Sequence, residues 1–367
     1  MDLDRLIELG LYDPDAVDAE ERLELLEGLD RFGLSPERLM AIDDELGLTF
    51  VPVFTALEPA GRTLVEVAAE LSIAPEELER YLRTAGLPEV DRSAKAFTGE
   101  DVAMFRTWRA LGDVIGLELG EQLLRTAGAS CARLAESGIA TFVEVTGRDD
   151  IDTGNTDLER VHFNEVAMAS YFESADTFTA LLRHHMRAAV RRWNVAADES
   201  TDRRVRFFVG FVDLVGYTPL SQELSTAELA QLFDHFETVA LNATAAHNGR
   251  IVKHIGDEVM FVATTAEAAL DIALTMIEEF RQDAAKTTPC GGVAVGDLLG
   301  REGDFYGPAV NLASRMADLA VPEEVLVSEE VRTAARSGPG GFGFESAGRR
   351  VLKGFADPVQ LWAARRD

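Results

Sequence analysis

The chain of 367 residues has few cysteines and no long apolar run. Its two cysteines, Cys131 and Cys290, lie far apart, so they offer neither a disulfide framework nor the spacing of a metal site, and a reducing compartment is expected. No apolar run approaches the roughly 20 residues that a membrane helix needs, and the acidic start lacks the apolar core of a signal peptide. We therefore expect a cytoplasmic protein with no membrane insertion.

Basic residues are also scarce: 35 lysines and arginines face 64 aspartates and glutamates, a formal net charge of −29. Residues 1–200 hold 40 acids and 19 bases, and residues 201–367 hold 24 and 16, so the net charges are −21 and −8. Such a field repels polyanions. Neither half is therefore expected to bind nucleic acid or an anionic membrane surface.

Residues 1–195 predict an all-helical domain. Residues 18–30 carry leucines at helical spacing, and a serine followed by proline at Ser35-Pro36 is typical of a helix start. Glycine marks a break on either side of that helix, at Gly33 and Gly47.

Residues 63–88 predict a helix, a short turn and a second helix. Together with the helical stretch 97–116 they resemble the helix-turn-helix unit of MerR-type regulators. Reading DNA needs a basic face, but residues 61–120 hold 7 bases and 11 acids. We expect a helical packing unit used for regulation rather than a DNA-binding one.

A further helical stretch covers residues 157–194. Residues 177–197, which include its second half, contain no acidic residue, and three arginines lie there at intervals of four on one face: Arg183, Arg187 and Arg191. One interpretation is a solvated or salt-bridged face. The other is a transmission helix that docks on acidic helices, biased by His184 and His185 near neutral pH. Residues 196–202 are the expected linker to a second domain, 203–367.

In the second domain the pattern changes to β-α-β-β-α-β, the order of a ferredoxin-like α+β core with additional elements. The first helix is predicted to start with a capping box at Ser225 and Glu228 and to end before Gly249. A similar start at Thr264 opens the second helix.

Two carboxylates are expected to meet at one end of this sheet. Asp213 follows a buried strand, and Asp257 lies at the tip of a hairpin. In a ferredoxin-like sheet the first strand lies beside the third, which brings the two together. Alone, the hairpin with Lys253 and Asp257 also fits an ordinary surface turn. Paired carboxylates without Cys or His suit Mg²⁺ or Mn²⁺, two ions per active site, in displacement at phosphorus.

Three motifs, FVDLVGYT, KHIGDEVMF and DFYGPAVNLASRM, follow one another along the chain. They resemble the class III nucleotidyl cyclases, which form a 3′,5′-cyclic monophosphate from a nucleoside triphosphate. The match covers about residues 203–366. It implies the following roles: metal binding by Asp213 and Asp257, base recognition by Lys253 and Asp304, transition-state support by Asn311 and Arg315, and, in a loop that differs, phosphate contact by Lys353.

The base-reading pair favours ATP as substrate. Adenine offers an acceptor at N1 and a donor at its amine, which a lysine and an aspartate can satisfy. Guanine reverses both and would leave buried charges unpaired. The resemblance further implies a head-to-tail homodimer with two shared active sites, each combining the metal pair of one chain with the remaining residues of the other.

Three other functions fit these residues less well. A guanylate cyclase would be expected to change Lys253 and Asp304, and a diguanylate cyclase would carry a Gly-Gly-acid loop near Gly256. A transcription factor with an inactive cyclase domain would need neither a complete set of site residues nor an acidic helix-turn-helix region. We expect an adenylate cyclase regulated by its helical domain, through protons or an apolar small molecule.

Overall fold

The computed structural model describes residues 2–45, 47–57, 61–146, 156–173, 175–196, 205–216, 220, 222–282, 287–338 and 341–367. Its contacts divide the chain into two compact units, residues 1–182 and 183–367. The dividing point lies inside a helix, earlier than the expected domain end at residue 195, and residues 197–202 of the expected linker lie outside the described part. No helix in the described ranges is long and apolar enough to cross a membrane.

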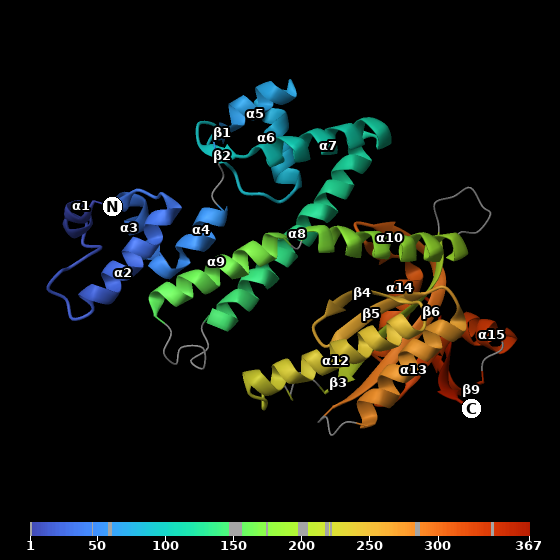
Figure 1. Ribbon diagram of the computed structural model, residues 1–367. Helices are drawn as coiled ribbons and strands as arrows, with labels where there is room; N and C mark the ends of the chain where they lie inside the picture. The colour runs from blue at the N-terminus through green and yellow to red at the C-terminus, as the bar shows by residue number, and fades with distance from the viewer. Residues whose placement is uncertain are drawn as a thin grey trace. The chain divides into compact units, whose positions relative to one another are not determined.

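The first unit is built from helices, as the sequence predicts, with one short two-stranded ribbon that it did not indicate. Figure 1 shows these elements along the chain. The ribbon pairs β1 with β2. The elements are α1 (Leu3–Glu8), α2 (Ala19–Leu29), η1 (Asp30–Phe32), α3 (Pro36–Glu45), η2 (Leu48–Phe50), α4 (Val51–Leu57), β1 (Arg62–Thr63), α5 (Leu64–Leu71), α6 (Pro75–Thr84), β2 (Lys95–Phe97), α7 (Gly99–Ile115), α8 (Leu117–Thr146), α9 (Asp157–Glu173) and α10 (Ala175–Ala196), which continues into the second unit.

The predicted helix-turn-helix is formed by α5 and α6. Thr63 opens α5 with a capping box to Glu66, and Thr98 opens α7 in the same way with Asp101. Apolar side chains of α5, α6, β2, α7 and α8 form one buried cluster, which includes Leu64 and Leu78. The helix-turn-helix region and its neighbouring helices therefore have a core of their own.

The second unit is a twisted sheet with helices on both faces. Its elements are β3 (Val205–Val215), α12 (Thr226–Ala246), β4 (Arg250–Ile255), β5 (Glu258–Ala263), α13 (Ala266–Gln282), β6 (Thr288–Arg301), β7 (Asp304–Tyr306), α14 (Pro308–Ala317), β8 (Val325–Ser328), α15 (Glu329–Ser337), β9 (Phe342–Arg350) and β10 (Val359–Arg366). The strand order is β4-β5-β3-β6-β8-β10-β9, and β7 pairs with β6. The first strand of the core, β3, thus lies beside the third, β5, as the ferredoxin-like prediction requires.

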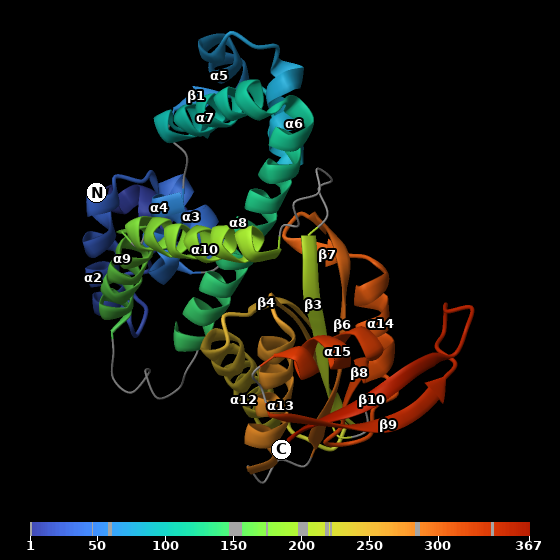
Figure 2. The ribbon, with the colours of Figure 1, turned by 90° about the vertical axis from the view of Figure 1, so that its right-hand side faces the viewer.

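Alternation along β3 separates two apolar layers. Val212 and Leu214 point into the cluster shared with α12 and α13, whereas Phe207 and Phe211 point into the cluster shared with α14. Figure 2 shows the strands side by side, with α14 on one face and α12 and α13 on the other. Because both faces are covered, β3 is a nearly continuous apolar run in the sequence.

The helix starts are close to those predicted, with one correction. Ser225 and Glu228 form the expected capping box of α12. For α13 the cap is Thr265, whose Oγ1 accepts from the Ala268 N–H at 3.2 Å, and not Thr264. The glycine after α12 is needed for packing, because a Cβ at Gly249 would lie 2.5 Å from Ile272 Cδ1.

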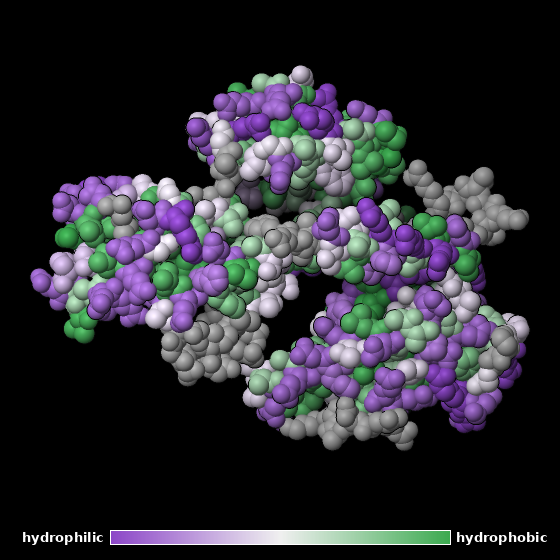
Figure 3. Space-filling view, viewed as in Figure 1, coloured by the Kyte–Doolittle hydropathy of each residue, from purple (hydrophilic) through white to green (hydrophobic). Residues whose placement is uncertain are grey.

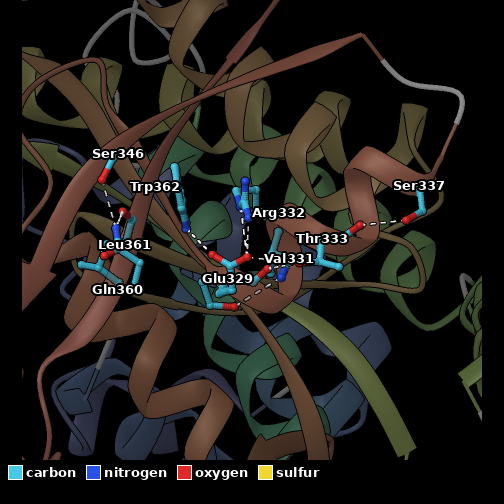
Figure 4. A network of polar contacts seen from close by, with 10 residues as sticks. Glu329, Val331, Arg332, Thr333, Ser337, Ser346, Gln360, Leu361 and Trp362 are labelled. Carbon is cyan, nitrogen blue, oxygen red and sulfur yellow. Dashed lines mark hydrogen bonds and ion pairs between the residues drawn. The ribbon is translucent and has the colours of Figure 1, made fainter.

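The far edge of the sheet is braced by a polar contact between α15 and β10 (Figure 4). Trp362 donates from Nε1 to Glu329 Oε2 at 2.6 Å, and the Arg332 guanidinium lies 4.1 Å above the Trp362 ring. Glu329 also accepts from Arg332. The cation–π contact and the charged hydrogen bonds fix the late strands that complete the sheet.

Polar and apolar residues both occur on the surface. Figure 3 shows hydrophilic residues in purple over much of the visible face of each unit, with smaller green patches of apolar residues between them. This agrees with the large excess of acidic side chains in the sequence.

Candidate active site

Strand pairing brings the two predicted metal-binding aspartates to one end of the sheet. Asp213, near the end of β3, is directly opposite Glu258 on β5. Asp257 lies in the turn just before Glu258, and its carbonyl accepts from the Leu214 N–H at 3.3 Å. Gly256 has a φ of 64°, a left-handed value that favours glycine in this turn.

This end of the sheet concentrates acidic side chains. Burial, followed by the neighbouring Asp257, raises the pKa of the Asp213 carboxyl to about 6. Burial also raises the pKa of Asp257. Burial, and then Asp213, raises the pKa of Glu258 to about 7. A site whose carboxylates resist ionisation in this way is stabilised by a bound cation.

The donor set fits a hard divalent ion. Carboxylate oxygens at the end of a strand suit Mg²⁺ or Mn²⁺, which keep water or substrate oxygens in their remaining positions. Among the residues that the structure describes, no group of three or more His, Cys, Asp or Glu side chains is arranged to hold a metal by itself. Asp213 and Asp257 could hold such an ion only together with water or other oxygen ligands.

The predicted base-reading pair is in direct contact. Lys253 on β4 donates from Nζ to Asp304 Oδ2 at 2.6 Å. The Phe305 N–H donates to Asp304 Oδ1 at 2.7 Å, so each carboxylate oxygen has a partner. Lys253 remains partly exposed, with 38% of its side-chain surface accessible. The pair is thus oriented and still open to a ligand.

Asn311 and Arg315 lie one turn apart on α14, which packs closely on β6. A Cβ at Gly292 would lie 2.3 Å from the Ala313 carbonyl oxygen, and one at Gly296 would lie 2.9 Å from Ala309 Cβ. Glycine at these two positions lets the helix approach the strand. Arg315 donates from Nη1 to Asp318 Oδ2 at 2.8 Å.

The metal pair and the base pair lie near opposite ends of β6. Asp213 pairs with Cys290 near the start of that strand, whereas Asp304 pairs with Arg301 at its end. Lys353 is exposed in the loop between β9 and β10. Of the predicted residues, the structure therefore brings together Asp213 with Asp257 and Lys253 with Asp304.

Two acidic residues near the site were not predicted from the sequence. Glu258 shares the end of the sheet with Asp213, and Asp318 holds Arg315. Glu258 directly follows Asp257 in the sequence, but its proximity to Asp213 depends on the register of β3 with β5. Residues 217–219, a few positions after Asp213, lie outside the described residues.

A hollow of about 710 Å³ lies between β6, the start of α14 and the loop after β9. Tyr306, Pro308 and Leu312 line it, together with Phe355. None of the seven predicted site residues is among its described lining residues.

Comparison with known proteins points to one enzyme family. The family model of the adenylate and guanylate cyclase catalytic domain matches residues 202–364. An adenylate cyclase of Streptomyces coelicolor is 33% identical over 72% of this chain and 69% of its own length. A pH-sensitive adenylate cyclase of Mycobacterium tuberculosis is 28% identical over 94% of this chain and 88% of its own.

A protein of the same mycobacterium named as uncharacterized is 29% identical over 99% of this chain and 94% of its own length. The likeness therefore extends beyond the sheet to the helical unit. The chain belongs to the class III adenylate and guanylate cyclase family and carries the catalytic domain of that family at residues 202–364.

Proposed function

We propose that the chain is an adenylate cyclase, which converts ATP to 3′,5′-cyclic AMP and pyrophosphate. The contact between Lys253 and Asp304 carries this proposal, because it presents one donor and one acceptor of the kind that the edge of adenine requires. The relatives named as adenylate cyclases support it. Guanine would place a donor against Lys253, which is itself a donor, and an acceptor against Asp304, which is itself an acceptor.

The reaction closes a ring on the substrate. The ribose 3′-oxygen loses its proton and forms a bond to the α-phosphorus, and the bond from that phosphorus to the oxygen of the leaving pyrophosphate breaks. A divalent cation held by Asp213 and Asp257 would supply charge neutralisation and a more acidic 3′-hydroxyl.

The side chains on α14 would act on the substrate directly. Arg315 offers a fixed positive fork to the charge that develops on the transferring phosphoryl group. Asn311, one turn earlier, would orient the ribose, and Lys353 would contact the phosphates. Lys253 and Asp304 would hold the base, so that the 3′-oxygen and the α-phosphorus meet in line.

We further propose that each active site is shared by two copies of the chain. The metal pair and the base pair lie near opposite ends of β6, which suits an arrangement in which one copy supplies the first and its partner the second. A symmetric dimer then holds two sites. Every residue needed is present in one chain, so no different partner is required.

The helical unit is proposed to regulate the cyclase by setting two catalytic units in or out of register. The match to a relative named as pH-sensitive includes this part of the chain. His184 and His185 are exposed, as are Arg183, Arg187 and Arg191, so they are accessible to a partner surface. Protonation of one or two histidines supplies only part of the roughly 5 kcal/mol of a near-complete switch, so an apolar ligand is a second input.

The test of the catalytic proposal is the rate of cyclic AMP formation by the purified full chain with Mg²⁺ or Mn²⁺. Asp213→Ala and Asp257→Ala should abolish it while the chain stays folded and dimeric. Turnover like that of the wild type in either variant would refute the metal assignment.

For regulation, the pH–activity profile should change in a His184→Ala/His185→Ala variant. An unchanged profile would show that these histidines do not carry the pH response.

A further inference from the structure

The last residues of α10 pack on the catalytic sheet. The Trp193 ring meets Phe207 of β3 edge to face, with the centroids 6.4 Å apart and the planes at 86°. The indole also covers Gly300 on β6, where a Cβ would lie 3.4 Å from the ring. Three residues later, Ala196 is buried in the same apolar cluster as Phe207. The end of this helix is thus attached to the strands that carry the site.

The contact continues from Phe207 to the residue beside Asp304. The rings of Phe207 and Phe305 have centroids 5.2 Å apart, and Phe305 is 4% exposed. The backbone N–H of Phe305 is the group that donates to Asp304 Oδ1. Any shift of the Phe305 backbone therefore turns the Asp304 carboxylate, together with its bond to Lys253.

A second side chain holds the same turn from β4. Arg250 donates from Nη2 to the Gly303 carbonyl at 2.5 Å, and its guanidinium lies 5.7 Å from the centroid of Phe305. The turn itself is tight, since Glu302 and Gly303 have φ values of 54° and 81°. Four residues, Trp193, Phe207, Phe305 and Arg250, thus form a continuous chain of contacts that ends at the β6–β7 turn, and we call them the turn clamp.

We propose that Trp193 and Arg250 are positioning residues for base recognition, which hold the β6–β7 turn so that Asp304 and Lys253 fit adenine. The inference depends on the proposed adenylate cyclase activity and adds to it the residues that set its selectivity. Neither residue needs to touch the substrate. Because Trp193 belongs to α10, the orientation of Asp304 and Lys253 depends on how the end of that helix packs on the sheet.

The observations distinguish this role from simple core packing. Trp193 keeps 43% of its surface exposed, so its removal takes away a local contact rather than a large part of the core. Lys253 and Asp304 would still be present in a Trp193→Ala variant, but less well aligned. Misalignment weakens the fit to adenine and reduces the rejection of guanine.

The experiment measures kcat and KM for ATP and for GTP with the full chain. Trp193→Ala should raise KM for ATP and lower the ratio of kcat/KM for ATP to that for GTP by about 10-fold, and Trp193→Phe should restore most of the ratio. Val195→Ala, at an exposed position of the same helix, is the matched control and should keep the wild-type ratio. Arg250→Lys tests the clamp from the other strand and should also lower the ratio.

A double-mutant cycle with Asp304→Asn makes the test specific. If Trp193 acts through Asp304, Trp193→Ala should change the ratio much less in the Asp304→Asn background. Equal losses toward ATP and GTP, or the same effect in both backgrounds, would overturn the inference. If Trp193→Ala does not fold, a wild-type ratio in Arg250→Lys would overturn it instead. A wild-type chain without any ATP preference would refute the proposed function itself.

Discussion

Replacing Asp213 by asparagine should make the metal-free protein more stable while it removes activity. The aspartate lies at the end of a buried strand beside Asp257 and opposite Glu258. Asparagine has nearly the same size but carries no charge. The variant therefore relieves repulsion among three carboxylates without opening a cavity.

The expected gain follows from the pKa of Asp213, which burial and then Asp257 raise from 3.8 to about 6. At about 1.36 kcal/mol per pKa unit this shift corresponds to about 3 kcal/mol at neutral pH. Solvent screening at this half-buried position reduces the expected gain to about 1–2 kcal/mol. For a unit of this size that is a rise in melting temperature of about 2–8 °C.

The pH dependence has a definite sign. Because the folded pKa lies above the unfolded one, the folded wild type binds more protons, and its stability falls as pH rises from about 4 to about 6. The difference between Asp213→Asn and wild type should therefore be largest at about pH 8 and about half as large at pH 5. Thermal unfolding of both chains in EDTA measures it.

Magnesium provides the control for this prediction. Millimolar Mg²⁺ should raise the melting temperature of the wild type and have little effect on Asp213→Asn. If Asp213→Asn is less stable than wild type at pH 8 in EDTA, then the ionised Asp213 carboxylate does not destabilise the metal-free protein. The interpretation of this end of the sheet as a cation site would then be wrong.

Three further predictions concern the base pair and the packing of the catalytic unit. Lys253→Gln should lower kcat/KM for ATP by at least about 10-fold, because Asp304 loses its charged partner. Steady-state kinetics with ATP and GTP measure this, and an unchanged preference for ATP over GTP would contradict it. Gly249→Val should destabilise the protein by about 1–3 kcal/mol, because its Cβ would overlap Ile272, and urea unfolding checks it. Ser225→Ala should cost about 1 kcal/mol through the lost cap of α12, whereas a cap without function would leave the urea midpoint unchanged.

Much of the catalytic fold can be predicted from the sequence. The order of strands and helices, together with the known order of a ferredoxin-like sheet, is enough to place Asp213 next to the hairpin of Asp257. Such predictions succeed because apolar strands and capped helices have local signatures. The assignment of Lys253 and Asp304 to one base-reading pair followed from the family resemblance, and their direct contact is seen only in the structure.

Other features depend on contacts that leave no local pattern. The β1–β2 ribbon has too few residues for a periodicity. Trp193 lies in a helical stretch whose pattern gives no sign that it meets Phe207, because the pairing of distant aromatic residues is decided by the folded chain. For the same reason the role of Glu258 becomes visible only when the register of β3 with β5 places it opposite Asp213.

The most direct measurement of the central claim mixes two inactive chains. Asp213→Ala lacks a metal-binding residue, and Arg315→Ala lacks a group for the transition state. In a heterodimer with shared sites, one of the two sites contains neither change. An equal mixture in which the copies exchange freely should therefore recover about a quarter of the wild-type rate of cyclic AMP formation, since half of the dimers are mixed and each has one intact site. No recovery, with heterodimers demonstrated by mass spectrometry, would contradict a cyclase whose active sites are built from two copies of this chain.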